Sequence, residues 1–305
     1  MSRPSLTKIR SVIIPAAGLG TRLLSATKEQ PKEMLPIFVE GDQETLCLKP
    51  MLQQIFEQLF DHGVRNFYFI VGREKRAIED HFTPDRELIK KLNNPNRRIQ
   101  MKQLADFYDR IDAATIVWVN QPVPKGFGDA VLRAENLVDD GSFIVNAGDT
   151  CVLSGDSGLI ARLARAHSRD GADATLSLRV VSDPRQYGVA EVSGKSQGSF
   201  RVRAVVEKPK RPRSSLAIMP LYVFTQKIFE ALRVTKIGTG RELQLTDAIQ
   251  KLIDTGYRVQ AVKLKADDIR LDVGTPETYW QALKATHRYA CMPQRLFRIP
   301  RMGRS

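Results

Sequence analysis

The first half of the chain alternates short apolar runs with stretches of helical periodicity. Leu52, Ile55, Phe56, Leu59 and Phe60 recur at helical spacing before the stop signal Gly63. A second helical stretch is expected over residues 129–138. The continuous apolar runs predict buried strands, and strands separated by helices favour a parallel sheet with right-handed crossovers. These strands are expected at Ser11–Pro15, Asn66–Val71, Thr115–Asn120 and Phe143–Asn146.

The second half mixes further strand patterns with two helices. The helices are expected at Leu243–Asp254 and Pro276–Tyr289, and Thr275 is a favourable N-cap for the second one. The charged stretch Asp85–Arg110 interrupts the earlier rhythm and is expected to form a helical excursion over the surface. Trp118 and Trp280 lie in apolar patterns and are expected in the core. Strands are expected at Ala174–Val180, Val189–Val192, Phe200–Val206, Ala217–Phe224 and Val259–Leu264.

Composition removes several classes of protein. With 42% apolar and 27% charged residues, the 305-residue chain can fill a core and is not disordered throughout. No apolar run approaches the ~18 residues of a membrane helix, and Met1–Arg10 has no apolar signal core, so a cytoplasmic location is expected. The cysteines, at positions 47, 151 and 291, are too far apart for a disulfide framework or a Cys-rich zinc site.

The net charge of +13 calls for an anionic partner. Composition alone leaves three kinds open: nucleic acid, a membrane surface, or a phosphorylated small molecule. No nucleic-acid-binding motif is present, and aromatic residues make up only 7% without a basic–aromatic alternation. These observations disfavour nucleic acid.

A glycine-rich loop, residues 16–22 (AAGLGTR), directly follows the first predicted strand. Glycines let the backbone approach a ligand and present bare N–H groups to an anion, and open α/β sheets bind ligands at the carboxyl ends of strands. The loop is not a Walker A motif, and it lacks the third glycine of the dinucleotide fingerprint, where Leu23 stands. Arg22, Lys28 and Lys32 follow closely, a cation set that suits a polyphosphate. The alternative is a glycine-rich turn beside a solvated basic face.

This loop and the segment 26–36 (ATKEQPKEMLP) together resemble the signature of nucleoside triphosphate:sugar-1-phosphate nucleotidylyltransferases. The similarity is greatest to the bacterial and archaeal UTP–glucose-1-phosphate uridylyltransferases and runs, block by block, over about residues 10–290. The other matching blocks are residues 72–82 (GREKRAIEDHF), 121–130 (QPVPKGFGDA), 148–149 (GD), 187–189 (YGV), 206–209 (VEKP), 242–247 (ELQLTD) and 271–274 (LDVG).

The resemblance implies an α/β, Rossmann-like nucleotidyltransferase fold with a mixed, mostly parallel central sheet flanked by helices. Residues 1–290 would form one domain, with the excursion at about 85–110, and residues 291–305 a basic, flexible tail. The implied reaction joins UTP and α-D-glucose 1-phosphate into UDP-glucose and pyrophosphate with Mg²⁺. Relatives are often dimers or tetramers, so a homo-oligomer is expected, without a membrane or nucleic-acid partner.

The resemblance also assigns roles to particular residues. Arg22, Lys32 and Lys208 would be catalytic: Arg22 on the leaving pyrophosphate, Lys32 on the α-phosphate or the incoming sugar phosphate, and Lys208 on the sugar phosphate. Asp149 and Asp272 would bind the metal. The remaining substrate contacts would be Ala17, Gly18, Gly20 and Thr21 to the triphosphate, Gln121 and Gly126 to the nucleobase, and Gly188 and Glu207 to the sugar.

Several positions depart from the bacterial pattern and concern specificity. Asp129 stands where a histidine is common, Ser215 where an asparagine is frequent, and residues 219–221 (MPL) where that pattern has a glycine and an arginine. A leucine-rich run with paired aspartates is replaced by residues 146–150 (NAGDT). The same reaction with dTTP or another sugar 1-phosphate is therefore an alternative, since one methyl group changes binding by only ~1–3 kcal/mol. A non-catalytic regulatory or nucleic-acid-binding protein on the same scaffold is a further alternative.

Each implied role has a simpler interpretation in the residues themselves. Asp149 follows Gly148, and Asp272 lies two residues before Gly274; aspartates in such positions often only cap turns. Glu207 and Lys208 could form a solvated pair, and Gln121 could be ordinary loop polarity. The chemistry itself needs no general base, because a phosphate monoester with a second pKa of ~6 is already an anion at neutral pH.

Overall fold

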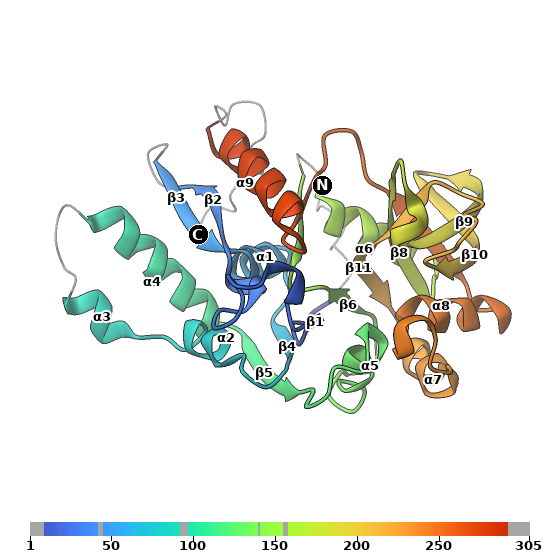
Figure 1. Cartoon of the computed structure of the whole chain (residues 1–305), viewed down its shortest axis with the longest axis horizontal. Helices are drawn as coiled ribbons and strands as arrows, with labels where there is room; N and C mark the ends of the chain where they lie inside the picture. Colours follow the sequence, from blue (N-terminus) through green and yellow to red (C-terminus); the bar gives the residue numbers. More distant parts are fainter. Residues whose placement is uncertain (1–8, 42–44, 92–96, 140, 155–157, 292–305) are drawn as a thin grey trace, which may run out of the picture.

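A computed structural model describes residues 9–41, 45–91, 97–139, 141–154 and 158–291 (Figure 1). The basic tail expected over residues 291–305 lies outside the described residues except for Cys291. In the described part of the chain, none of the helices has the length and apolar character to cross a membrane.

The central feature is a mixed sheet, which in the described residues has nine strands in the order β5-β4-β1-β6-β11-β8-β12-β10-β9. The strands β5, β4, β1 and β6 are parallel, as is the pair β8–β12, and the other pairings are antiparallel. A contact between Ala217 and Val189 pairs β11 with β9, so the last five strands close into a ring. The strands are β1 (Ser11–Pro15), β4 (Asn66–Val71), β5 (Thr115–Asn120), β6 (Phe143–Asn146), β8 (Ala174–Val180), β9 (Gly188–Ser196), β10 (Ser199–Glu207), β11 (Leu216–Phe224) and β12 (Val259–Lys263).

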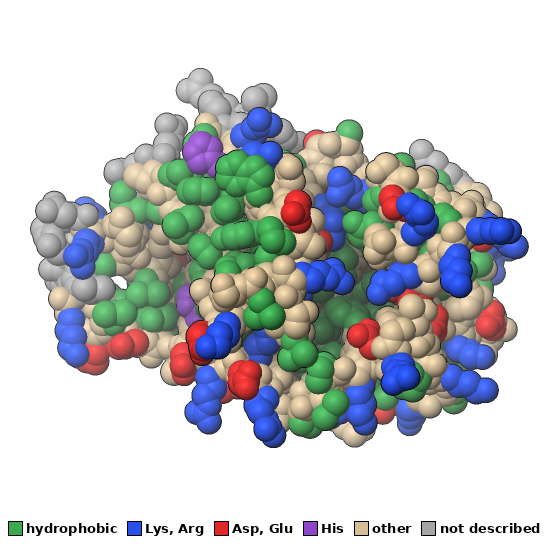
Figure 2. Space-filling view, viewed as in Figure 1, with side chains coloured by type: hydrophobic (Ala, Val, Ile, Leu, Met, Phe, Trp, Pro, Cys, Tyr) green, Lys and Arg blue, Asp and Glu red, His purple; other side chains and the backbone are tan. Residues whose placement is uncertain are grey.

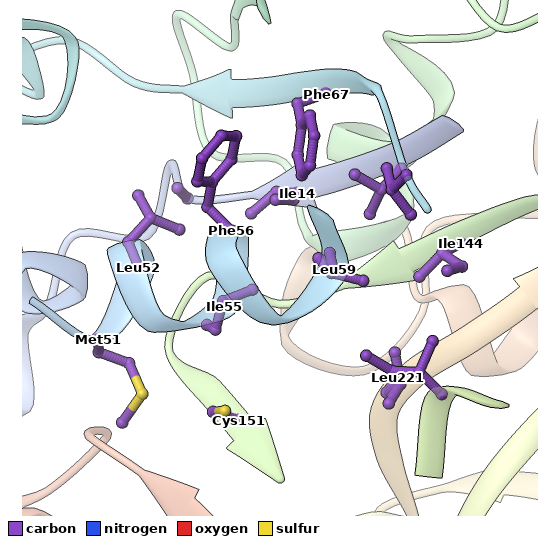
Figure 3. Close-up of a cluster of buried hydrophobic side chains, with 14 of the residues drawn as sticks. Ile14, Met51, Leu52, Ile55, Phe56, Leu59, Phe67, Ile144, Cys151 and Leu221 are labelled. Carbon is purple, nitrogen blue, oxygen red and sulfur yellow. The ribbon is translucent and has the colours of Figure 1, made fainter. Parts of the chain in front are cut away.

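The central strands are apolar throughout because helices cover both faces of the sheet. In β1, Val12 and Ile14 enter one buried cluster, whereas Ile13 points into the other. The first cluster holds α1 (Met51–Asp61), α2 (Arg76–His81), α4 (Arg98–Asp112) and α6 (Leu159–Asp170), and Figure 3 shows part of it around Phe56 and Phe67. The second holds α5 (Phe127–Leu132), α7 (Lys227–Val234) and α8 (Leu245–Asp254).

Two small sheets lie beside the main one. The hairpin β2 (Pro36–Glu40) with β3 (Leu46–Pro50) packs against α9 (Pro276–Ala290), and β13 (Ile269–Asp272) pairs antiparallel with β7 (Thr150–Leu153). The second pairing joins segments more than a hundred residues apart in sequence. It places Asp272 opposite Thr150 and therefore next to Asp149.

Some local expectations hold and others need correction. The excursion at 85–110 is helical, as α3 (Arg86–Lys91) and α4, and α9 begins with Thr275 as N-cap and a capping box. The helix expected over 129–138 instead ends at Leu132, and its remainder forms turns. Trp118 packs on the core, but Trp280 is 57% exposed, because α9 buries a face made of Ala282, Thr286 and Ala290.

His167 provides a pH-dependent element of this scaffold. It is buried, and its two ring nitrogens lie 2.8 Å from Ser142 Oγ and 3.0 Å from Thr175 Oγ1. Burial lowers the pKa of His167 from 6.5 to about 4, although Asp173 opposes this shift.

The unfolded chain binds the His167 proton more tightly than the folded protein. The contribution of neutral His167 to the free energy of unfolding is therefore complete above pH 6.5 and is lost as the pH falls toward 4. We expect this loss to reach about 3 kcal/mol of unfolding free energy. Urea unfolding of the wild type and His167→Gln between pH 7.5 and 4.5 measures it. The variant should show a shallower acid dependence, and parallel curves would contradict the prediction.

Candidate active site

The glycine-rich loop lies at the carboxyl ends of three adjacent strands. Ala16 N–H donates to the carbonyl of Ile70 at 2.8 Å, and Gly148 N–H donates to the carbonyl of Pro15 at 3.0 Å. These contacts connect the ends of β1, β4 and β6, the edge where open α/β sheets bind ligands. Gly18 and Leu19 at the loop tip are exposed, so their side of the backbone faces solvent.

The second half of the loop is held by Thr27. Gly20 has φ +67°, a conformation that favours glycine, and its carbonyl accepts from Thr27 Oγ1 at 2.9 Å. Thr21 and Arg22 follow in an exposed 3-10 turn. In the described part of the chain, no ion pair engages the Arg22 guanidinium, which leaves its donors available for an anion.

Lys32 and Asp149 form the charged centre of the site. Lys32 Nζ lies 2.5 Å from Asp149 Oδ2, and it would lie 3.7 Å from a Cβ at Gly18, which places the ammonium against the loop. Burial favours neutral forms of both groups, but their attraction outweighs it. Burial and then Asp149 act on the pKa of Lys32, which is raised overall, and burial and then Lys32 act on the pKa of Asp149, which is lowered overall.

Asp272 lies near Lys32 and Asp149 and forms an ion pair with Arg270. Its Oδ2 is ion-paired with Arg270, two residues away on the same face of β13, and its Oδ1 accepts from Gly274 N–H at 2.6 Å. The turn-capping interpretation of Asp272 therefore holds for one oxygen only. Asp272 also helps to raise the pKa of Lys32, so both carboxylates act on the same ammonium.

The donor set is compatible with a hard divalent cation, although a complete metal site is not preformed. Among the described residues, no group of three or more His, Cys, Asp or Glu side chains is arranged around one ion position. Asp149 and Asp272 nevertheless bring two carboxylates together, and each already stabilises a positive charge. Magnesium prefers oxygen ligands and keeps several waters, so two carboxylates with phosphate oxygens suit it.

A buried ion pair involves Glu33, the residue that follows Lys32. Lys75 Nζ lies 3.0 Å from Glu33 Oε2, and both side chains are more than nine-tenths buried. Burial raises the pKa of Glu33, while Lys75 and then Lys32 oppose that rise. Glu33 also contributes to the raised pKa of Lys32, after the effect of Asp149.

Gln121 lies at the end of β5, beside the loop. It is buried, and its N–H donates to the carbonyl of Val71 at 2.8 Å. Gly72 directly follows Val71, and a Cβ at Gly72 would be 3.2 Å from the carbonyl oxygen of Ala17. The end of β4 therefore lies against the glycine-rich loop. The Gln121 amide reaches Gly126 O at 3.3 Å and Asp129 Oδ2 at 2.7 Å. It is not a freely solvated loop side chain.

Gly188, Glu207 and Lys208 form a second polar group at the ends of β9 and β10. Thr246 Oγ1 donates to Glu207 Oε2 at 2.7 Å, and a Cβ at Gly188 would clash with that hydroxyl at 2.8 Å. Lys208 Nζ lies 3.7 Å from Glu207 Oε1 and is half-exposed. Lys208 has φ +42°, which is costly for a residue with a side chain and is a feature of functional positions.

Aromatic and backbone contacts connect these groups. The Arg270 guanidinium lies 6.0 Å from the Tyr187 ring, which links the carboxylate centre to the Gly188 side. Gly128 N–H donates to Leu243 O at 2.9 Å, which connects the Gln121 loop to the segment that carries Thr246. Figure 2 shows this face hollowed between α9 and the β9–β10 region, with Lys and Arg side chains around the hollow.

The expected site residues thus occupy neighbouring positions. Lys32 contacts Asp149 and lies against Gly18, and Asp272 is near enough for its charge to act on Lys32. Glu207 and Lys208 form a second group with Gly188. Arg22 and Thr21 lie on the loop without a direct contact to either group in the described residues.

Three kinds of residue in and around the site were not predicted from the sequence. Arg270 pairs with Asp272, and its alternation with Asp272 on one strand was the available signal. Thr246, which positions Glu207, lies in a matched block without an assigned role. The Glu33–Lys75 pair had no local signal, because its members are 42 residues apart.

Comparisons with known proteins find similarity over nearly the whole chain. A sequence model described as nucleotidyl transferase matches residues 11–288. The chain is 37% identical over 293 residues to the UTP–glucose-1-phosphate uridylyltransferase of Staphylococcus epidermidis, covering 93% of each. It is 37% identical over 277 residues to the protein of that name from Bacillus subtilis, covering 88% of each.

Solved structures give the same result. A UDP-glucose pyrophosphorylase complexed with UDP-glucose matches with a TM-score of 0.79 and 29% identity, covering 92% of this chain and 99% of that one. The UTP-bound UGPase from Acinetobacter baumannii matches with a TM-score of 0.76 and 27% identity, covering 94% and 95%. The arrangement of loop, carboxylates and second polar group is therefore carried on the scaffold of these proteins.

Proposed function

This chain belongs to the nucleotidyl transferase family, and from that premise we propose that it transfers the uridylyl group of UTP to α-D-glucose 1-phosphate. The products are UDP-glucose and pyrophosphate. The observation that carries the proposal is the position of Lys32, between the exposed loop at Gly18 and the carboxylate of Asp149.

The reaction requires two anionic substrates to approach each other. The cationic side chains of the site can reduce the repulsion between them. The sugar phosphate oxygen attacks the α-phosphorus of UTP, the bond to the β-phosphate bridging oxygen breaks, and pyrophosphate leaves in line. Positioning and charge stabilisation account for most of the catalysis of such transfers. We assign Arg22 to the pyrophosphate, Lys32 to the α-phosphate or incoming phosphate, and Lys208 to the sugar phosphate.

The backbone and the second polar group complete the substrate contacts. Ala17, Gly18, Gly20 and Thr21 line the loop that receives the triphosphate, and Gln121 with Gly126 receives the nucleobase. Oε2 of Glu207 accepts a hydrogen bond from Thr246 Oγ1. We therefore assign Oε1 as the oxygen that accepts a hydrogen bond from a sugar hydroxyl. Gly188 leaves room there, because a side chain would meet Thr246 and Glu207.

Nucleotidyl transferases of this family typically use a divalent metal ion, and we propose Mg²⁺ for this chain. Asp149 and Asp272 would hold it. When bound, the ion neutralises phosphate charge as the transfer proceeds. Lys32 is ion-paired with Asp149, and Arg270 is ion-paired with Asp272.

A substrate panel tests the proposal. Purified protein with glucose 1-phosphate and Mg²⁺ is expected to release pyrophosphate from UTP, and EDTA should stop the release. Parallel assays with dTTP, and with galactose or mannose 1-phosphate, define the specificity. Absence of pyrophosphate release from UTP and glucose 1-phosphate would contradict the proposal. Equal turnover of dTTP and UTP would show that the enzyme is not strictly specific for UTP.

Arg22→Ala and Lys208→Met should weaken the binding of different substrates. Arg22 lies on the triphosphate loop, whereas Lys208 lies beside Glu207 on the sugar side. We expect Arg22→Ala to raise KM for UTP about tenfold and to lower kcat, and Lys208→Met to raise KM for glucose 1-phosphate about tenfold, since a charge-assisted contact contributes ~1.5–3 kcal/mol. Steady-state kinetics with each substrate varied measures the split, and each variant is the control for the other. An equal effect of both variants on both KM values would contradict these roles.

Three broader proposals follow from the same assignment. Residues 1–290 act as one domain, supported by the continuous sheet from β5 to β9. A cytoplasmic location fits consumption of a nucleoside triphosphate. We also propose that the chain forms a homo-oligomer, and light scattering of the full chain at several concentrations measures its size.

A further inference from the structure

Asp129 contacts the side chain that we assign to the nucleobase. Asp129 Oδ2 lies 2.7 Å from Gln121 Nε2 and also 3.1 Å from Arg133 Nε. Arg133 directly follows the last residue of α5, so the carboxylate is held between the end of this helix and the end of β5. The position is one where the resemblance leads us to expect a histidine, so its chemistry is a property of this chain.

A carboxylate oxygen that receives a guanidinium N–H acts only as an acceptor, and this determines which way the amide of Gln121 lies. The amide must present its NH₂ group to Asp129. The second hydrogen of that NH₂ group points to Gly126 O at 3.3 Å. Both donors of Gln121 are therefore engaged by the protein, and Oε1 is the atom left for a ligand.

The same chain contains this arrangement in a second place, away from the site. Gln250 Nε2 donates to Asp254 Oδ1 at 2.7 Å, and Gln250 Oε1 accepts from Val205 N–H at 2.7 Å. There the aspartate holds the amide nitrogen and the oxygen receives an N–H group. At Gln121, the corresponding N–H has to come from the ligand.

We propose that Asp129 is a specificity-determining, positioning residue, which fixes Gln121 as a hydrogen-bond acceptor for the N3–H group of uracil. The inference rests on the proposed function, in which Gln121 receives the base. Uracil carries a hydrogen on N3, whereas N3 of cytosine carries a lone pair. A fixed acceptor therefore favours uracil and opposes cytosine, because two acceptors would face each other. Thymine has the same N3–H group, so Asp129 does not separate UTP from dTTP.

Asp129→Asn tests the proposal with almost no change in shape. Asparagine can accept through Oδ1 or donate through Nδ2, so the Gln121 amide is no longer held in one orientation. We measure kcat/KM for UTP, CTP and dTTP with glucose 1-phosphate and Mg²⁺, and melting temperatures of each protein. The wild type should prefer UTP over CTP by at least about a hundredfold, and the variant should reduce this ratio about tenfold or more, as expected for loss of one well-formed polar contact.

The UTP:CTP ratio separates positioning from general damage. A merely structural effect would lower all three activities together and leave both ratios unchanged, whereas loss of positioning lowers the UTP:CTP ratio and keeps the UTP:dTTP ratio within about twofold of the wild type. Asp254→Asn is the matched control, because it alters the equivalent contact of Gln250 and should change neither ratio. If Asp129→Asn does not fold, Asp129→Ser provides the same loss of a fixed acceptor.

The outcomes distinguish this inference from the proposed function. Wild-type turnover of UTP with equal turnover of CTP, or an unchanged UTP:CTP ratio in the folded Asp129→Asn protein, overturns the role of Asp129 and leaves the reaction standing. Failure of the wild type to use UTP removes both. A fall in the UTP:CTP ratio with a constant UTP:dTTP ratio supports the inference.

Discussion

Asp149→Asn is expected to lower kcat/KM about a hundredfold to a thousandfold, while the protein stays folded. The carboxylate holds Lys32 at 2.5 Å and is one of the two oxygen donors that we propose for Mg²⁺. Asparagine keeps the shape and removes the charge, so Lys32 loses its partner and is no longer fixed at the loop. Loss of one preorganised charged group in such a site costs about this much in rate.

Pyrophosphate release at saturating and limiting UTP measures the effect. Asp109→Asn is a matched control, because Asp109 also contacts a cation, Arg86 at 3.1 Å, but on the exposed side of α4. Combining Asp149→Asn with Lys32→Met should cost much less than the product of the single effects, since both remove the same contact. A folded Asp149→Asn protein with activity within threefold of the wild type would falsify the role of this carboxylate.

Lys75→Met is expected to lower the free energy of unfolding by about 3–5 kcal/mol, the usual cost of removing one member of a buried ion pair. Glu33 is 1% exposed and would lose its nearest cation. Burial already raises the pKa of Glu33, and removal of the Lys75 charge should raise it further. The folded variant then binds this proton more tightly than the unfolded chain. Relative to the wild type, the variant should therefore regain stability as the pH falls from 7 to 5.

Urea unfolding at several pH values measures both effects. Lys90→Met is the control for a surface pair, because Lys90 and Glu87 are 2.7 Å apart but mostly exposed, and such pairs contribute only ~0–1 kcal/mol. The double variant Glu33→Met with Lys75→Met should be more stable than Lys75→Met alone, since no unpaired charge remains. A Lys75→Met curve that coincides with the wild type at pH 7 would show that water reaches Glu33.

The central strands could be predicted because burial on both faces makes them apolar throughout. The runs at Ser11–Pro15, Asn66–Val71 and Ala174–Val180 have the bounds expected from the sequence. Elements with less apolar or shorter patterns were missed: the hairpin β2–β3, the strand pair β7–β13, α6 and α7. The position of Trp280 was wrongly expected, because the periodicity of α9 does not say which face the hairpin covers.

The sequence alone determined the local chemistry of the site: a strand followed by glycines and cations, and aspartates within two residues of a glycine. Local chemistry follows from residue types a few positions apart, which the chain holds together covalently. Only the tertiary structure decided that Asp272 stands beside Asp149, that Thr246 holds Glu207, and that Asp129 orients Gln121. Those contacts depend on strand register and on loop packing, and residues that are distant in sequence carry no local signal of either.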